Sequence, residues 1–218
     1  MTVAVLAFGD DLPRRQRGPL DGLPTRSVDG PAEIDAAIAG YGRLVVIGAD
    51  ADLAAVLSRL LRADRLDIEV AYVPRRRTTA TRVYRLPAGR RAARHARRGS
   101  ARRVTLVRDE TGSVIVGRAH WLPADNQQPL RGEAVVDDTR LFDGDVTSVS
   151  IEPTLAMPGL RASVRKGAQA RFWRRWIAGR AVQLGSTGVT VVRDGVPALR
   201  SARRSTFYRN VEGWLLVR

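Results

Sequence analysis

The sequence predicts a protein of two parts, a small parallel three-layer α/β domain followed by an antiparallel β-sandwich domain. Up to Pro74, apolar runs alternate with helical patterns, which is typical of a parallel sheet covered by helices. From Val104 onward, the chain shows short alternating runs separated by turn signals such as Asp143-Gly144 and Asp194-Gly195. Alternation of this kind, broken by Asp-Gly pairs, is typical of antiparallel strands joined by tight turns.

The expected parallel strands cover residues 2–8, 43–48 and 67–74. The second of these runs is apolar without alternation, as a strand buried on both faces requires. One helix is expected over residues 31–40, because proline stands at its start and glycine at its end. Another is expected over residues 51–62, where leucines and a valine recur on one face.

After Pro74 the pattern changes, and this change sets the predicted domain boundaries. The first domain is expected to cover residues 1–87, a basic helix or linker residues 88–100, and the β-sandwich residues 101–218. The last aromatic residues of the chain are expected to lie in the core of the sandwich: Phe207, Tyr208 and Trp214.

Composition limits the chemistry that the chain can perform. It has no cysteine and only two histidines, which excludes disulfides and thiolate metal sites and disfavours a histidine relay. No apolar run is long enough to cross a bilayer, and the N-terminal residues lack the pattern of a signal peptide. We therefore expect a cytoplasmic protein, with peripheral association at a membrane surface as an alternative.

Charge indicates the class of partner. The formal net charge is +15, and all but one of the 37 basic residues are arginine, the exception being Lys166. Arginine offers a planar fork that matches phosphate. The expected partners are nucleotides or anionic lipids, with nucleic acid as an alternative. A GC-rich genome would also enrich arginine, and the sequence leaves this explanation and the oligomeric state open.

The order of elements, together with one turn, resembles the diacylglycerol kinase catalytic family, the relatives of NAD kinases and sphingosine kinases. In that family a Rossmann-like first domain carries a Gly-Gly-Asp-Gly-Thr turn, followed by a valine four residues further on. The matching positions here are Gly48, Ala49, Asp50, Ala51, Asp52 and Val56. Alanine in place of glycine costs about 1 kcal/mol or more where the backbone must be left-handed, so these changes weaken a phosphate-binding turn. They predict an ordinary helix entry, with Ala49 and Ala51 at negative φ and Asp50 or Asp52 capping the helix.

Two further family motifs fall on altered residues. A proline followed by Gly-Thr-Gly-Asn-Asp falls on Pro74 and residues 75–81, where only the proline is kept. An Asp-Gly-Glu motif near the end falls on Asp194, Gly195 and Val196, and valine cannot accept a proton. The resemblance implies ATP and Mg²⁺ as cofactors, with Asp50 as the remaining catalytic acid and Mg²⁺ ligand.

These observations lead to the hypothesis of a lipid-kinase-like protein with eroded motifs, which binds a phosphate-containing ligand without efficient phosphoryl transfer. The candidate phosphate-binding residues are Gly48, Asp52, Arg75, Arg76, Arg77, Thr78 and Thr79, with Asp194 and Gly195 as a motif remnant. Other interpretations stay open: Asp50 and Asp52 would also suit the capping of a helix, and the arginines of residues 75–77 would also suit a solvated loop. Two alternative functions remain: an active ATP-dependent lipid kinase with a substituted site, and a basic regulatory protein that binds nucleic acid or another partner.

Overall fold

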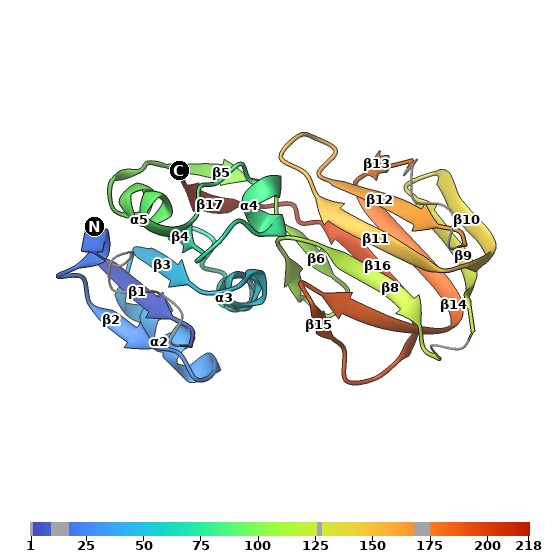
Figure 1. The fold of residues 1–218 in the computed structure, drawn as a ribbon, viewed down its shortest axis with the longest axis horizontal. Helices are drawn as coiled ribbons and strands as arrows, with labels where there is room; N and C mark the ends of the chain where they lie inside the picture. Colours follow the sequence, from blue (N-terminus) through green and yellow to red (C-terminus); the bar gives the residue numbers. More distant parts are fainter. Residues whose placement is uncertain (1, 10–17, 126–127, 168–174) are drawn as a thin grey trace. The chain divides into compact units, whose positions relative to one another are not determined.

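The computed structural model describes residues 2–9, 18–125, 128–167 and 175–218, and shows two units (Figure 1). The first unit is formed by Met1–Thr105 and Val211–Arg218, and the second by Leu106–Asn210. Each unit has its own sheet, one mostly parallel and one antiparallel. The predicted fold class is therefore confirmed.

The first unit is built on a six-stranded sheet with the order β2-β1-β3-β4-β17-β5. Its strands are β1 (Val3–Ala7), β2 (Thr25–Ser27), β3 (Arg43–Ile47), β4 (Glu69–Val73), β5 (Ala101–Val104) and β17 (Trp214–Val217). All neighbours pair in parallel except β17 and β5, which are antiparallel. Strand β3 is buried along its whole length, in agreement with its unbroken apolar sequence.

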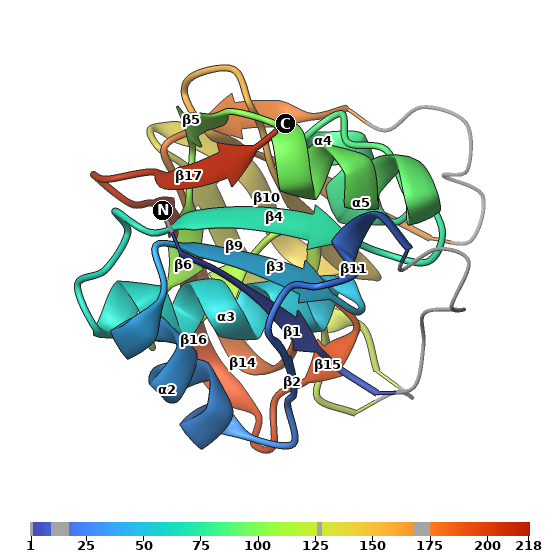
Figure 2. The ribbon, with the colours of Figure 1, turned by 90° about the vertical axis from the view of Figure 1, so that its left-hand side faces the viewer.

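Helices cover both faces of this sheet (Figure 2). On one face lie α2 (Pro31–Gly40), with Ile34 and Ile38 buried, and α3 (Asp50–Arg62), with Leu53, Leu57 and Leu60 buried. On the other lies α5 (Gly89–Arg98), where Ala92, Ala93 and Ala96 pack with Val45 and Val73 of the sheet. The short helices η1 (Gly18–Leu20) and α4 (Thr79–Val83) complete the unit. Among the described residues, no helix has the length and apolar character needed to span a membrane.

The second unit is an eleven-stranded antiparallel sheet around its own apolar core. Its strands are β6 (Val107–Asp109), β7 (Val114–Ile115), β8 (Ala119–Pro123), β9 (Leu130–Val136), β10 (Thr139–Val146), β11 (Ser148–Pro153), β12 (Leu160–Arg165), β13 (Ile177–Gly179), β14 (Ala181–Arg193), β15 (Val196–Pro197) and β16 (Ala202–Arg209). The long β14 pairs with β9 over its first half and with β8 over its second half. This exchange of partners lets one sheet surround a core that includes Trp121 and Phe207.

The units differ from the predicted domain boundaries at both ends of the second domain. The expected basic helix or linker is α5, which packs on the first sheet, and β5 follows it in the same sheet. The last strand, β17, also lies in this sheet, between β4 and β5. Its apolar sequence suits a strand buried on both faces, but the sequence pattern does not show which sheet receives it.

Two local predictions were wrong, one about the place of Trp214 and one about a turn at Asp143 and Gly144. Trp214 does not lie in the core of the second unit, because it belongs to β17 and packs edge-on against Tyr84 with ring centroids 5.3 Å apart. Asp143 and Gly144 lie inside β10 and form no turn between strands. The turn between β9 and β10 is made by Asp137 and Asp138, with Asp137 in the left-handed region at φ 48°.

Candidate anion site on the first unit

The turn between β3 and α3 is held by a carboxylate of the protein itself. Ala49 is the N-cap of α3, with φ −86° and ψ 175°, so it has the ordinary helix-entry conformation that the glycine-to-alanine changes predict. Its N–H donates to Oδ2 of Asp52 over 2.7 Å. A Cβ atom added to Gly48 would lie 2.3 Å from the same oxygen. The carboxylate of Asp52 thus lies where a bound phosphate would have to approach the turn.

Asp50 begins α3 and connects it to two other elements. Its Oδ1 accepts a hydrogen bond from the Tyr72 hydroxyl over 2.9 Å, and its Oδ2 accepts one from the backbone N–H of Ala80 over 3.0 Å. Tyr72 lies in β4 and is 3% exposed. Burial, reinforced by the negative charge of Asp50, raises the pKa of the Tyr72 hydroxyl, so it remains a hydrogen-bond donor. Both oxygens of Asp50 therefore have internal partners.

The loop after Pro74 leads into α4, whose first turn is also satisfied internally. Thr78 is the N-cap: its Oγ1 accepts from the Thr81 N–H over 3.2 Å, while its own N–H donates to the Thr81 hydroxyl over 2.8 Å. This reciprocal pair is a capping box. Together with the bond from Ala80 to Asp50, it engages amides that a glycine-rich loop would offer to phosphate.

The end of α4 holds an arginine in an unusual backbone conformation. Arg85 has φ 56°, in the left-handed region that favours glycine. The following Leu86 N–H donates to the Thr81 carbonyl over 2.8 Å, which closes the helix in the manner of a Schellman motif. A residue other than glycine at this position carries a conformational cost, which makes its side chain a candidate for a functional role.

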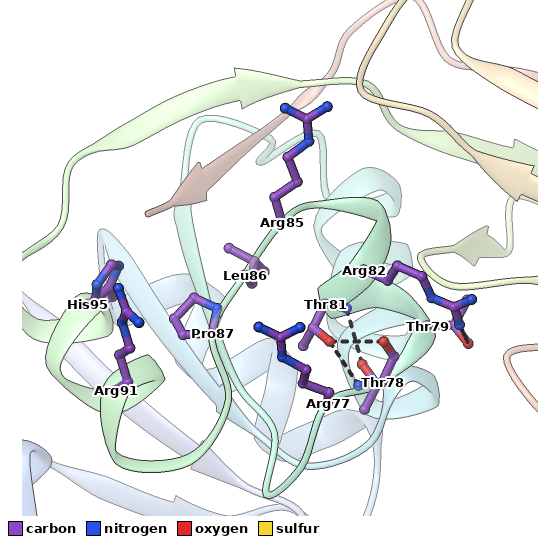
Figure 3. Close-up of a pocket in the computed structure, with 10 residues that line it drawn as sticks. All are labelled: Arg77, Thr78, Thr79, Thr81, Arg82, Arg85, Leu86, Pro87, Arg91 and His95. Carbon is purple, nitrogen blue, oxygen red and sulfur yellow. Dashed lines mark hydrogen bonds between the residues drawn. The ribbon is translucent and has the colours of Figure 1, made fainter.

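A cavity of about 760 Å³ lies between α4 and α5 (Figure 3). It is lined by Arg77, Thr78, Thr79, Thr81, Arg82, Arg85, Leu86, Pro87, Arg91 and His95. Figure 3 shows Arg91 and His95 on one side of Pro87 and Arg77 on the other. No aspartate or glutamate is among the described residues that line it. A concave surface with several guanidinium groups and no carboxylate is suited to binding an anion.

The position of α5, which supplies one wall of the cavity, is fixed by a buried arginine of β3. Arg43 is 7% exposed, and its Nε donates to Glu69 Oε2 over 2.6 Å. The other guanidinium nitrogens donate to the carbonyls of Ala96 and Gly99, over 3.1 and 3.0 Å. These carbonyls belong to the C-terminal end of α5, where a positive charge is favourable. The guanidinium therefore attaches the helix to the sheet.

The structure brings together only part of the predicted site. Arg77, Thr78 and Thr79 line the cavity, whereas Arg75 and Arg76 are exposed and are not among its lining residues. The turn with Gly48, Asp50 and Asp52 is joined to α4 through the bond from Asp50 to Ala80, but none of the three lines the cavity.

The predicted motif remnant near the end of the chain belongs to the second unit. Asp194 and Gly195, with φ 47° and 89°, form the turn between β14 and β15. The Asp194 carboxylate accepts hydrogen bonds from the backbone N–H groups of Val116, Gly117 and Arg118, over 3.0, 2.7 and 2.9 Å. These contacts give Asp194 a structural role in ordering the loop before β8.

Seven lining residues were missing from the predicted site: Thr81, Arg82, Arg85, Leu86, Pro87, Arg91 and His95. The signal for two of them was present, because Arg91 and His95 are four residues apart in the arginine-rich segment and must share a face of a helix. No local pattern could show that this face lies opposite α4.

The residues present do not fit a magnesium centre. Both oxygens of Asp50 accept hydrogen bonds, and no group of three or more histidine, aspartate or glutamate side chains gathers in the described part of the chain. Mg²⁺ in nucleotide sites is held by carboxylates together with substrate phosphates. The arginine-lined cavity, by contrast, offers guanidinium donors of the kind that bind an anion.

The mostly parallel first unit and the large antiparallel second unit define the fold shared by diacylglycerol kinases and NAD kinases. A diacylglycerol kinase from Bacillus anthracis str. Sterne matches with a TM-score of 0.76 and 10% identity, over 99% of this chain and 96% of that one. An NAD kinase from Archaeoglobus fulgidus, in complex with ATP, matches with a TM-score of 0.68 and 12% identity, over 100% of this chain and 94% of that one.

Yeast NADH kinase, complexed with NADH, has the same fold, with a TM-score of 0.60 and 10% identity, over 100% of this chain and 83% of that one. No protein-family model matches the sequence, and no curated protein does so at a significant level. At these identities the similarity is one of fold.

Proposed function

We propose that the protein binds a phosphate-containing ligand, a nucleotide or the headgroup of an anionic lipid, in the cavity between α4 and α5. One observation carries the proposal: Arg77, Arg82, Arg85 and Arg91 line this cavity together with His95, and no described carboxylate lines it. Guanidinium groups form charge-assisted and often bidentate hydrogen bonds with phosphate oxygens.

The arginines of the cavity have little else to bind. Arg77, Arg85 and Arg91 are exposed and form no ion pair within the described residues, and Arg82 makes only a long hydrogen bond of 3.4 Å, to the Thr79 hydroxyl. Elsewhere in the first unit, arginines do pair with carboxylates, as Arg59 does with Asp35. An anion in the cavity would relieve the mutual repulsion of these charges.

We further propose that phosphoryl transfer is inefficient. Transfer needs carboxylates that hold Mg²⁺ and a group that orients or deprotonates the attacking hydroxyl. The one family-like acid, Asp50, is engaged by Tyr72 and Ala80, and Asp52 is engaged by Ala49. These internal bonds support a structural role for the turn: it stabilises the fold and does not receive a nucleotide.

The test compares two triple variants with equal loss of charge. Arg77→Ala, Arg82→Ala and Arg85→Ala together remove one wall of the cavity, whereas Arg200→Ala, Arg203→Ala and Arg204→Ala remove three exposed arginines of the second unit. Binding of ATP, ADP, tripolyphosphate and anionic lipid vesicles is measured by calorimetry and thermal shift, with and without Mg²⁺. We expect the cavity variant to lose about tenfold or more in affinity and the control to lose much less.

Two results would contradict the proposal. Equal losses in both variants, at low and at moderate salt, would mean that only net charge matters. Phosphorylation of a lipid extract that depends on ATP and Mg²⁺ and is abolished by Asp50→Asn would establish an active kinase.

A further inference from the structure

A second cavity adjoins the first along α5. It has a volume of about 460 Å³ and is lined by Arg91, Arg94, His95, Arg98, Gly99 and Arg218. Arg91 and His95 line both cavities. As in the first cavity, no aspartate or glutamate is among the described lining residues. The two cavities therefore form one continuous cationic surface, with Arg91 and His95 at the junction.

The spacing of this surface is set by the helix. Arg91, His95 and Arg98 follow one another at intervals of four and three residues, so they share one face of α5. From Arg91 to Arg98 the helix rises about 10 Å. The opposite face is fixed by Ala92 and Ala96, which are buried against the sheet. These three side chains are thus held in a row on a rigid support.

Resting on the proposed function, we propose that one extended anion occupies both cavities, with phosphate groups on each side of Arg91 and His95. The ligand class is a chain in which phosphate groups follow one another directly, as in inorganic polyphosphate. A single orthophosphate would reach only one cavity, whereas a chain can engage Arg82 and Arg85 at one end and Arg94 and Arg98 at the other. Joining two weak contacts in this way raises affinity through effective concentration.

The lining favours such a chain over nucleic acid or a membrane surface. Neither cavity has a tryptophan, tyrosine or phenylalanine among its described lining residues, so bases have no platform for stacking. The apolar side chains of the lining are Leu86, which is 6% exposed, and the half-buried Pro87, and together they offer little surface for insertion into acyl chains. What the two cavities share is positive charge in a concave surface.

The experiment measures the affinity of tripolyphosphate and of a longer inorganic polyphosphate, at equal total phosphate, by calorimetry. Three double variants are compared: Arg94→Ala with Arg98→Ala in the second cavity, Arg82→Ala with Arg85→Ala in the first, and Arg200→Ala with Arg203→Ala as the control. Because Arg94 and Arg98 are exposed and alanine favours helix, the second-cavity variant is expected to fold, which circular dichroism verifies.

We expect the wild-type protein to bind the longer chain about tenfold or more tightly than tripolyphosphate. The second-cavity variant should lose this gain while its affinity for tripolyphosphate stays at the level of the control. The first-cavity variant should bind both anions more weakly.

The spanning ligand and the proposed phosphate site are refuted by different results. The spanning ligand is refuted, and the phosphate site stands, if tripolyphosphate binds but the longer chain binds no more tightly. The same conclusion holds if the second-cavity variant binds the longer chain as tightly as the control variant does. If no phosphate compound binds, the proposed function itself is refuted. An oligothymidylate or anionic vesicles that bind more tightly than polyphosphate, and lose affinity in the second-cavity variant, would assign this surface to nucleic acid or membrane instead.

Discussion

The backbone N–H of Ala80 donates a hydrogen bond to Oδ2 of Asp50 over 3.0 Å and so joins the first turn of α4 to the first turn of α3. The other oxygen of Asp50 accepts the hydrogen bond from the Tyr72 hydroxyl. In this arrangement a carboxylate of the protein lies between two turns whose amides would otherwise face an anion.

Asp50→Ala should destabilise the protein by about 2 to 3 kcal/mol, because the buried Tyr72 hydroxyl and the Ala80 N–H lose a charged acceptor. Urea denaturation at neutral pH measures this change. Asp67→Ala is the control, since Asp67 forms an exposed ion pair with Arg65 and should have little effect. Binding of tripolyphosphate should be kept in both variants. An Asp50→Ala protein as stable as the control would argue against a structural role for Asp50.

Tyr72→Phe should change how stability depends on alkaline pH. Burial first, and then Asp50, raises the pKa of the folded hydroxyl above its unfolded value of about 10. The unfolded chain therefore releases this proton at lower pH than the folded protein, so the contribution of Tyr72 is complete below about pH 10 and is lost as the pH rises further.

The measurement for Tyr72 is urea denaturation of the wild type and of Tyr72→Phe from neutral to alkaline pH. The wild type should lose more stability than the variant above about pH 10. The chain has one lysine and four tyrosines, so it holds few side chains of the types whose ordinary pKa is near 10. Parallel curves for the two proteins would show that Tyr72 ionises equally in both states.

Arg85→Gly should stabilise the protein by about 1 kcal/mol and weaken anion binding at the same time. Glycine removes the strain of φ 56°, and the change also removes a guanidinium from the cavity. Arg85→Ala is the matched variant, because it removes the same charge and keeps a Cβ in the left-handed region. Thermal denaturation and calorimetry with tripolyphosphate separate the two effects. If both variants bind as the wild type does, Arg85 has no part in the site.

Arg43→Ala should cost about 3 to 5 kcal/mol, because it leaves Glu69 and two helix carbonyls without their buried partner. Hydrogen exchange should show the largest loss of protection at the C-terminal end of α5. Combining Arg43→Ala with Glu69→Gln should cost less than the sum of the single changes. Additive effects would mean that the two residues stabilise the unit independently.

The sequence by itself determined the elements whose signal is local. The unbroken apolar run of residues 43–47 predicted a strand buried on both faces, and β3 is buried throughout. The Asp194-Gly195 pair predicted a tight turn, and both residues have positive φ. The replacement of glycine by alanine at Ala49 predicted an ordinary helix entry, which is what the backbone shows. Each of these features depends on a few neighbouring residues.

Only the tertiary structure decided which distant segments meet. The residues of β17 could pair with either sheet, and their place between β4 and β5 depends on backbone hydrogen bonds to strands far away in the chain. The cavity likewise depends on α4 and α5 facing each other across Pro87, with Arg43 attaching α5 to the sheet. Local periodicity fixes the face of a helix on which a residue lies, whereas packing between elements fixes what that face meets.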